Sequence, residues 1–245
     1  MKFFKYVDLS KIKVLSFDLD NTIYDCQSVL TKAEDYFTSY LCQRYGLGGE
    51  CASYSFWAKI KSNLLKERPE LENDVTMLRA VSLVEAFKLL KLPLKGGLDE
   101  ALELVALFVK HRSAGFVAPE IFTMLSNLKS RYSLVAVSNG NLDAKQLGVL
   151  DYFEKDIRPN MERLRCKPNE DMFLECARFK NVKNDEILHI GDDPYTDVYG
   201  SVLANIPCVW LYKGYTGISP DERKIKLLPN IMIDNILELN TLLLN

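Results

Sequence analysis

From residue 119 onward, short apolar runs alternate with longer segments in which apolar residues recur at helical spacing. This alternation is typical of a mostly parallel sheet covered by helices on both faces. The pattern predicts strands over 12–17, 134–137, 186–190 and 207–211, and helices over 119–131, 169–179, 196–204 and 236–244. We therefore expect an α/β fold with a Rossmann-like, doubly wound, mostly parallel sheet.

The segment between the first two strands has no convincing strand pattern. Its apolar residues recur at helical spacing, and turn signals at 46–49, at Arg68-Pro69 and over 93–97 divide it into about four helices. The sequence therefore predicts a catalytic core made of residues 1–25 and 116–245. A helical cap, residues 26–115, is expected as an insertion in that core.

Charge and composition exclude several classes of protein. The chain has 31 Lys and Arg against 33 Asp and Glu, a balance that gives no electrostatic footprint for nucleic acid or an acidic membrane. No apolar stretch approaches the roughly 20 residues of a membrane helix, and the N-terminus has no signal-peptide pattern. Six scattered cysteines without a C-x-x-C pair predict reduced thiols. We expect a cytoplasmic protein without nucleic-acid or membrane partners, and its oligomeric state stays open.

Polar residues follow the predicted strands at the points where the strands end. The first strand leads into Asp18 and Asp20, the second into Ser138 and Asn139, and the third into Asp192, Asp193 and Asp197, with Lys167 between the second and third. Ligands of such sheets bind beyond the carboxyl ends of the strands. These side chains are therefore expected to meet at one edge of the sheet.

Physical chemistry limits what such a site can do. Several carboxylates at close range repel one another unless a cation neutralises them, and oxygen ligands suit Mg²⁺. A lysine and a serine hydroxyl beside that ion would form a pocket for phosphate oxygens. A carboxylate can act as a nucleophile. The set therefore predicts Mg²⁺-dependent phosphoryl transfer from a small phosphorylated metabolite, through an acyl phosphate on the protein.

Three aspartates are assigned to the reaction and the metal. Asp18 is the predicted nucleophile and a metal ligand. Asp20 is predicted to act as general acid and then general base, and its backbone carbonyl is a further metal ligand. Asp192 is predicted to bind the metal directly.

The remaining polar residues are assigned to the phosphate and to the water around the metal. Ser138 and Asn139 are expected to hold phosphoryl oxygens, and Lys167 to offset the charge of the phosphate and of Asp18. Asp193 and Asp197 are expected to act through the metal's water shell.

The four motifs in this order resemble those of the haloacid dehalogenase-like hydrolase superfamily, and the helical insert resembles the cap of its subfamily I. The resemblance implies a phosphatase. The stretches 74–79, 139–141, 148–154 and 187–193 are also similar to a bacterial branch. Its members dephosphorylate 5-amino-6-(5-phospho-D-ribitylamino)uracil, a riboflavin precursor, and FMN.

Within the cap, Arg79 is the residue expected to bind the substrate. Tyr54, Phe56 and Trp57 are expected to serve in packing, with stacking on a flavin-like ring as the alternative. In the core, His189 is expected to be a satisfied buried histidine. The basic cluster Arg158, Arg163 and Arg165 could attract a phosphorylated substrate or simply lie in a solvated loop.

Three alternatives remain open beside the phosphatase. A phosphomutase, or a phosphatase of a sugar phosphate, would share the same core motifs. A dehalogenase needs neither an acid two residues after the nucleophile nor a metal, so Asp20 and the Asp192 cluster disfavour it. A catalytically dead binding protein would be free to lose Asp18, Asp20 or Asp192, and all three are present.

Overall fold

The computed structural model describes residues 1–47, 53–215, 217 and 225–244. Within this part of the chain seven strands form one sheet in the order β1-β7-β6-β5-β2-β3-β4. Every neighbouring pair is parallel except β1 and β7. The strands are β1 (Lys2–Phe3), β2 (Val14–Phe17), β3 (Ser133–Val137), β4 (Lys155–Ile157), β5 (Ile187–Gly191), β6 (Cys208–Leu211) and β7 (Ile231–Ile233). The predicted mostly parallel sheet is confirmed.

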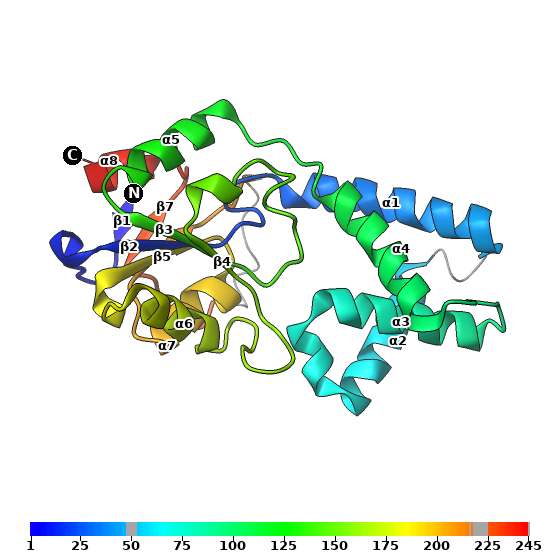
Figure 1. The fold of residues 1–245 in the computed structure, drawn as a ribbon. Helices are drawn as coiled ribbons and strands as arrows, with labels where there is room; N and C mark the ends of the chain where they lie inside the picture. The colour runs from blue at the N-terminus through cyan, green and yellow to red at the C-terminus, as the bar shows by residue number, and fades with distance from the viewer. Residues whose placement is uncertain (48–52, 216, 218–224, 245) are drawn as a thin grey trace.

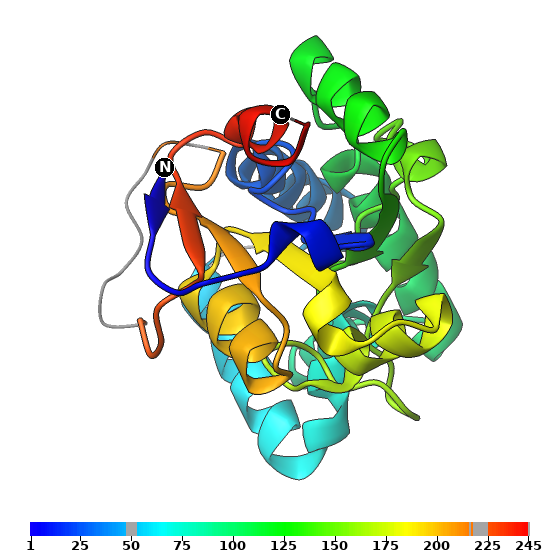
Figure 2. The same cartoon turned by 90° about the vertical axis from the view of Figure 1, so that its left-hand side faces the viewer.

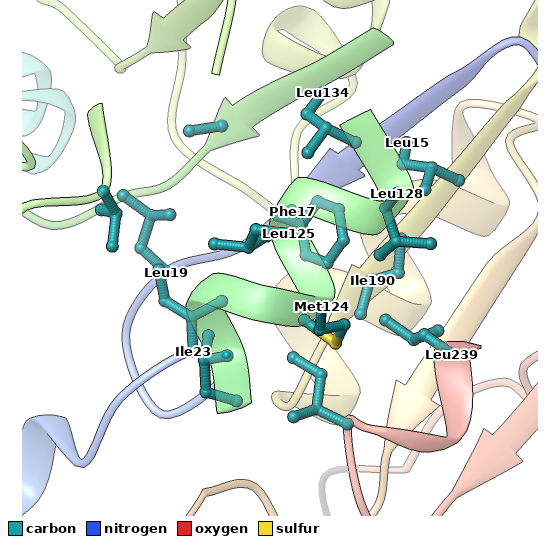
Figure 3. Close-up of a cluster of buried hydrophobic side chains, with 14 of the residues drawn as sticks. Leu15, Phe17, Leu19, Ile23, Met124, Leu125, Leu128, Leu134, Ile190 and Leu239 are labelled. Carbon is teal, nitrogen blue, oxygen red and sulfur yellow. The ribbon is translucent and has the colours of Figure 1, made fainter. Parts of the chain in front are cut away.

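Helices cover both faces of this sheet (Figure 1). Helices α5 (Pro119–Lys129) and α8 (Glu238–Leu244) lie on one face, and α6 (Asp171–Lys180) and α7 (Gly200–Leu203) lie on the other. Figure 2 shows the same layers with the left-hand side of Figure 1 facing the viewer. Since side chains alternate along a strand, Leu15 and Phe17 of β2 pack against α5 and α8, as Figure 3 shows, while Val14 belongs to the opposite core.

The register of the central strand β2 with its two neighbours determines where the ends of these strands lie. All of its residues are buried, and it pairs with β3 and β5 on its two sides. Phe17 lies opposite Ala136 of β3 and Ile190 of β5. The residues that follow these three strands therefore emerge at one edge of the sheet, as the sequence predicted.

In the described parts of the segment between β2 and α5 there are four α-helices, and the sequence predicted about four. They are α1 (Cys26–Tyr45), α2 (Tyr54–Glu67), α3 (Val75–Leu89) and α4 (Gly97–Arg112). Their apolar faces enclose a separate core that includes Phe37, Phe87 and Phe108. These helices, with the turn over Pro69–Asn73, form the cap, seen to the right of the sheet in Figure 1.

The two chain segments that join the cap to the core lie side by side. A side chain at Gly115 would place its Cβ 2.9 Å from Cδ2 of Tyr24, so the returning segment needs glycine to pass the outgoing one. Among the hydrogen bonds that join the cap to the core are two from the α3 side of the cap. Asn141 Nδ2 donates to Thr76 Oγ1 (3.1 Å), and the backbone N–H of Cys166 donates to Asn73 Oδ1 (2.8 Å).

Short elements differ from the prediction. Strands β1, β4 and β7 were not predicted, because two or three residues carry too little periodicity to be recognised. The helix expected over 196–204 begins earlier, as a π-helical turn over Pro194–Tyr199 that continues into α7. No helix in the described ranges is both long enough and apolar enough to span a membrane.

Candidate active site

The centre of the site is an ammonium group held between two carboxylates. Lys167 Nζ donates to Asp18 Oδ1 (2.8 Å) and to Asp197 Oδ1 (2.6 Å), and all three residues are buried. Burial alone would lower the pKa of Lys167, but the two carboxylates raise it above its ordinary value, so the lysine stays charged. The structure thus brings Lys167 against Asp18, the predicted nucleophile.

A third carboxylate completes an acidic cluster. One oxygen atom from each of Asp18, Asp192 and Asp197 lies within 4.8 Å of the others. Burial raises the pKa of Asp18 to about 7, and the charges of Asp197 and Asp20 add to that effect although Lys167 opposes it. Burial likewise raises the pKa of Asp192 to about 9, again with help from neighbouring carboxylates. One ammonium does not neutralise this cluster, which is the situation that a divalent cation would relieve.

Hydrogen bonding separates the members of the cluster that are free to bind a metal from those that are not. Asp197 uses Oδ1 for Lys167 and for His189 Nε2 (3.1 Å), and Oδ2 for the backbone N–H of Asp193 (3.0 Å). Among the described residues, Asp192 accepts through its side chain only a long bond from Thr22 Oγ1 (3.4 Å). Oxygen donors from Asp18 and Asp192 therefore fit Mg²⁺ best, while Asp197 is already engaged.

The side chains of Asp193 and His189 have structural partners. Asp193 Oδ1 accepts from the backbone N–H groups of Tyr195 and Thr196 and so caps the turn that follows. The His189 ring is fully buried, with Nδ1 2.9 Å from Ser16 Oγ and Nε2 facing Asp197. The expectation of a satisfied core histidine is confirmed.

The loop after β3 supplies a hydroxyl without a partner and an amide that holds Lys167. Ser138 Oγ is buried and makes no hydrogen bond within the described part of the chain. Asn139 accepts from the backbone N–H of Lys167 (2.8 Å) and donates to its carbonyl (2.9 Å). The Asn139 side chain therefore fixes the segment that carries Lys167, and Ser138 Oγ is available for a ligand oxygen.

Asp20 is not part of the acidic cluster and lies instead beside a buried guanidinium. Arg112, the last residue of α4, donates through Nη2 to Asp20 Oδ1 (2.7 Å), and the hydroxyl of Tyr24 donates to the same oxygen. Burial acts to raise the pKa of Asp20, but Arg112 and Tyr24 outweigh it and hold that pKa below its ordinary value. The sequence analysis missed Arg112 because nothing local marks it as a partner of a residue 92 positions away.

Arg79 lies in the cap beside a cavity of about 670 Å³ between α1, α2 and α3. Its guanidinium forms two hydrogen bonds with Glu34, at 2.6 and 3.1 Å, and stacks on the ring of Phe108 at 3.7 Å. Trp57 and Lys61 also line this cavity. Arg79 therefore faces a space that could receive part of a ligand.

The other residues named from the sequence serve mainly in packing and pairing. Phe56 and Trp57 pack edge to face and belong to the apolar clusters of the cap, and the side chain of Tyr54 lies outside the described part. Arg163 and Arg165 pair with Glu175 and Asp171. Arg158 donates to the carbonyl of Gly140 (2.6 Å) and pairs with Asp156. The five described cysteines are free thiols, and Cys51 lies outside the described residues.

Comparison with known proteins places this geometry in a family. A family model described as haloacid dehalogenase-like hydrolase matches residues 12–201. The chain is 30% identical to the Escherichia coli protein YigB, named a 5-amino-6-(5-phospho-D-ribitylamino)uracil phosphatase, over 97% of this chain and 99% of that protein. It is 26% identical to human N-acylneuraminate-9-phosphatase, over 96% and 95% of the two chains.

Solved structures agree with the sequence relatives on the fold. A structure titled 2-haloacid dehalogenase from Pseudomonas syringae matches with a TM-score of 0.83 at 29% identity, over 95% of this chain and 98% of that one. A phosphatase from Thermococcus onnurineus matches with a TM-score of 0.64 at 25% identity, over 95% and 98%. The predicted resemblance, including that to the bacterial branch, is confirmed. The chain belongs to the haloacid dehalogenase-like hydrolase family and is an enzyme of that family.

Proposed function

We propose that this enzyme is a Mg²⁺-dependent phosphatase that hydrolyses a small phosphorylated metabolite through an aspartyl-phosphate on Asp18. The observation that carries the proposal is the contact of Lys167 with Asp18 inside a cluster of three carboxylates, of which Asp18 and Asp197 are buried and Asp192 is partly buried. Such a cluster suits a hard divalent cation, and the ammonium beside the nucleophile suits an anionic phosphoryl group.

In the first half-reaction, an oxygen of Asp18 attacks phosphorus and the bond between phosphorus and the leaving oxygen breaks. Asp20, which Arg112 and Tyr24 keep ionised in the free enzyme, would take up a proton when the anionic phosphate binds beside it, and would deliver that proton to the leaving oxygen. Lys167, the Ser138 hydroxyl and the backbone N–H of Asn139 stabilise the charge on the transferred phosphoryl group. The Ser138 hydroxyl is buried and has no hydrogen-bond partner among the described residues, which supports its role as a phosphate ligand.

In the second half-reaction, the Asp20 carboxylate accepts a proton from water as that water attacks phosphorus of the aspartyl-phosphate. The bond to Asp18 breaks and inorganic phosphate is released. Mg²⁺, held by Asp18, Asp192 and the backbone carbonyl of Asp20, would neutralise the phosphoryl charge in both steps. Asp193 and Asp197 would act on the ion only through water, and the bonds that Asp197 makes support this indirect role.

The choice of substrate is proposed to lie with the cap, residues 26–115, since the core site contacts only the phosphoryl group and one leaving oxygen. Arg79 and the cavity beside it would bind the organic part of the substrate. The similarity to YigB favours 5-amino-6-(5-phospho-D-ribitylamino)uracil or FMN, and hence a cytoplasmic role in riboflavin metabolism. A sugar phosphate, as substrate of a phosphatase or a mutase, is the alternative within the same mechanism.

A dehalogenase is the second candidate, because the Pseudomonas syringae structure shares the fold closely. A halide leaves without a proton, and its displacement needs no metal. The acidic cluster of Asp18, Asp192 and Asp197 would then have no cation to bind, and Asp20 no proton to deliver. These residues favour the phosphatase.

The proposal is tested with p-nitrophenyl phosphate, a panel of phosphorylated metabolites and 2-chloropropionate. We expect turnover of the phosphates that is lost in EDTA and restored by Mg²⁺. Asp18→Asn should remove it, because the amide is a poor nucleophile of nearly the same shape. Metal-independent phosphate release, or chloride release from 2-chloropropionate in place of phosphatase activity, would refute the proposal.

A further inference from the structure

Arg112 joins the cap to the loop that carries the nucleophile. It ends α4, one residue before the segment that returns to the core, and its side chain is only 4% exposed. One arm of its guanidinium contacts Asp20, and the other, Nη1, donates to Asn141 Oδ1 (2.8 Å). The planar fork therefore fixes two groups of the core from a residue of the cap.

The hydrogen bonds of Arg112 extend through Asn141 to helix α3 of the cap. Asn141, bound to Arg112 through its oxygen, donates through Nδ2 to Thr76 in the first turn of α3. A polar chain of Asp20, Arg112, Asn141 and Thr76 thus links the nucleophile loop to the end of α4 and the start of α3. The position of the Asp20 carboxylate is tied through this chain to the position of the cap.

The surroundings of the pair leave the Asp20 carboxylate little freedom. Its second oxygen, Oδ2, lies so close to Gly140 that a Cβ there would be 2.4 Å away, and the same Cβ would be 3.1 Å from Arg112 Nη1. Arg112 Nε has no hydrogen-bond partner among the described residues although it is buried. An unsatisfied buried donor is unfavourable. The guanidinium of Arg112 is therefore oriented by its hydrogen bonds to Asp20 and Asn141, which outweigh the unsatisfied Nε.

From this geometry we infer that Arg112 is a positioning residue, which holds the Asp20 carboxylate in its working place when the cap is seated on the core. The inference rests on the role proposed above for Asp20. In the proposed mechanism Arg112 is not a ligand of the phosphoryl group, and its effect on the reaction is transmitted through Asp20. Its removal should therefore impair the proton-dependent step and leave substrate binding and metal binding unchanged.

The test is a double-mutant cycle of Arg112→Met and Asp20→Asn, with Arg112→Lys as a second variant. Lysine keeps the charge but cannot bridge Asp20 and Asn141. Single-turnover formation of the phosphoenzyme is measured with an alkyl phosphate, whose leaving group needs a proton, and with p-nitrophenyl phosphate, which hardly does. Lys155→Met, which breaks a partly buried ion pair with Glu175 outside the site, is the control, and thermal unfolding confirms that each variant is folded.

We expect both Arg112 variants to lower the rate with the alkyl phosphate on the order of 10²-fold, with KM nearly unchanged and the p-nitrophenyl phosphate rate reduced by less than about threefold. In the Asp20→Asn background, Arg112→Met should reduce the rate almost no further.

Three outcomes would overturn the inference. They are losses from Asp20→Asn and Arg112→Met that multiply in the double mutant, equal losses on both substrates, and unchanged or faster turnover of the alkyl phosphate. If Asp20→Asn alone reduced both rates equally, the proposed role of Asp20 would fall and this inference with it. A selective loss in Asp20→Asn that the Arg112 variants do not share would overturn the role of Arg112 alone.

Discussion

Ser138 and Asn139 are neighbours in the loop after β3, and their side chains have opposite surroundings. Ser138 Oγ has no partner in the described part of the chain, so Ser138→Ala removes no hydrogen bond from the free protein. We expect its melting temperature to stay the same or rise slightly. The value of kcat/KM should fall by one or two orders of magnitude, about 1.4–2.8 kcal/mol, because the phosphoryl group loses a donor.

Asn139→Ala is the matched comparison and should behave in the opposite way. It removes both hydrogen bonds to the backbone of Lys167, so we expect the free energy of unfolding to fall by about 1–3 kcal/mol. Thermal denaturation and steady-state kinetics of the two purified variants separate these effects. If Ser138→Ala destabilised the protein as much as Asn139→Ala, Ser138 would be a structural residue and its phosphate role would be wrong.

At the scale of the elements, Arg79 fastens α3 to α1 through Glu34 and to α4 through Phe108. If the substrate is FMN or the ribitylaminouracil phosphate, Arg79→Ala should lower kcat/KM for it by one or two orders of magnitude. Hydrolysis of p-nitrophenyl phosphate, which leaves the cap cavity largely empty, should change much less.

Glu34→Gln is the control for this prediction, because it weakens the ion pair and keeps the Arg79 cation beside the cavity. We expect Glu34→Gln to lower kcat/KM for the same substrate less than Arg79→Ala does. The melting temperatures of the two variants should be similar. Parallel losses on FMN and on p-nitrophenyl phosphate would assign Arg79 to folding of the cap, and unchanged kinetics on both would remove it from the substrate site.

The strands that the sequence predicted are those whose residues are buried on both faces. Strands β2, β3, β5 and β6 are mostly apolar, with Ser16 inside β2 and His189 inside β5, and the structure places each strand within one or two residues of its predicted bounds. β4 was missed because it has only three residues, Lys155–Ile157, of which two are charged, so it shows neither an apolar run nor a period. The acidic cluster was predicted because each member follows a strand, and the partnership of Asp20 with Arg112 was not, since it depends on where the cap returns.

At the scale of the whole molecule, the raised pKa values of Asp18 and Asp192 link stability to pH. An acid whose pKa is higher in the folded than in the unfolded state keeps its proton longer when folded. The free energy of unfolding therefore decreases as pH rises from the unfolded value, near 4, to the folded values of about 7 and 9. The metal-free protein should melt at progressively lower temperature across this range.

Mg²⁺ should flatten that dependence, because the ion stabilises the ionised carboxylates. In the metal-free state, Asp192→Asn should also flatten it and raise the melting temperature above pH 7. Calorimetry at several pH values, with EDTA or with Mg²⁺, measures both effects. A melting temperature of the EDTA-treated protein that is constant between pH 5 and 9 would contradict the electrostatic account of the cluster.

The contact between Gly115 and Tyr24 has a consequence for how this enzyme could diversify. The chain leaves and re-enters the core at one place. The segment between Tyr24 and Gly115 is therefore an insertion whose two ends lie side by side, and we call it a cassette. Its length and helices can be replaced without altering any strand register. Selection for a new substrate can thus act on the helices of this cassette, as long as Arg112 at the end of α4 keeps its contact with Asp20.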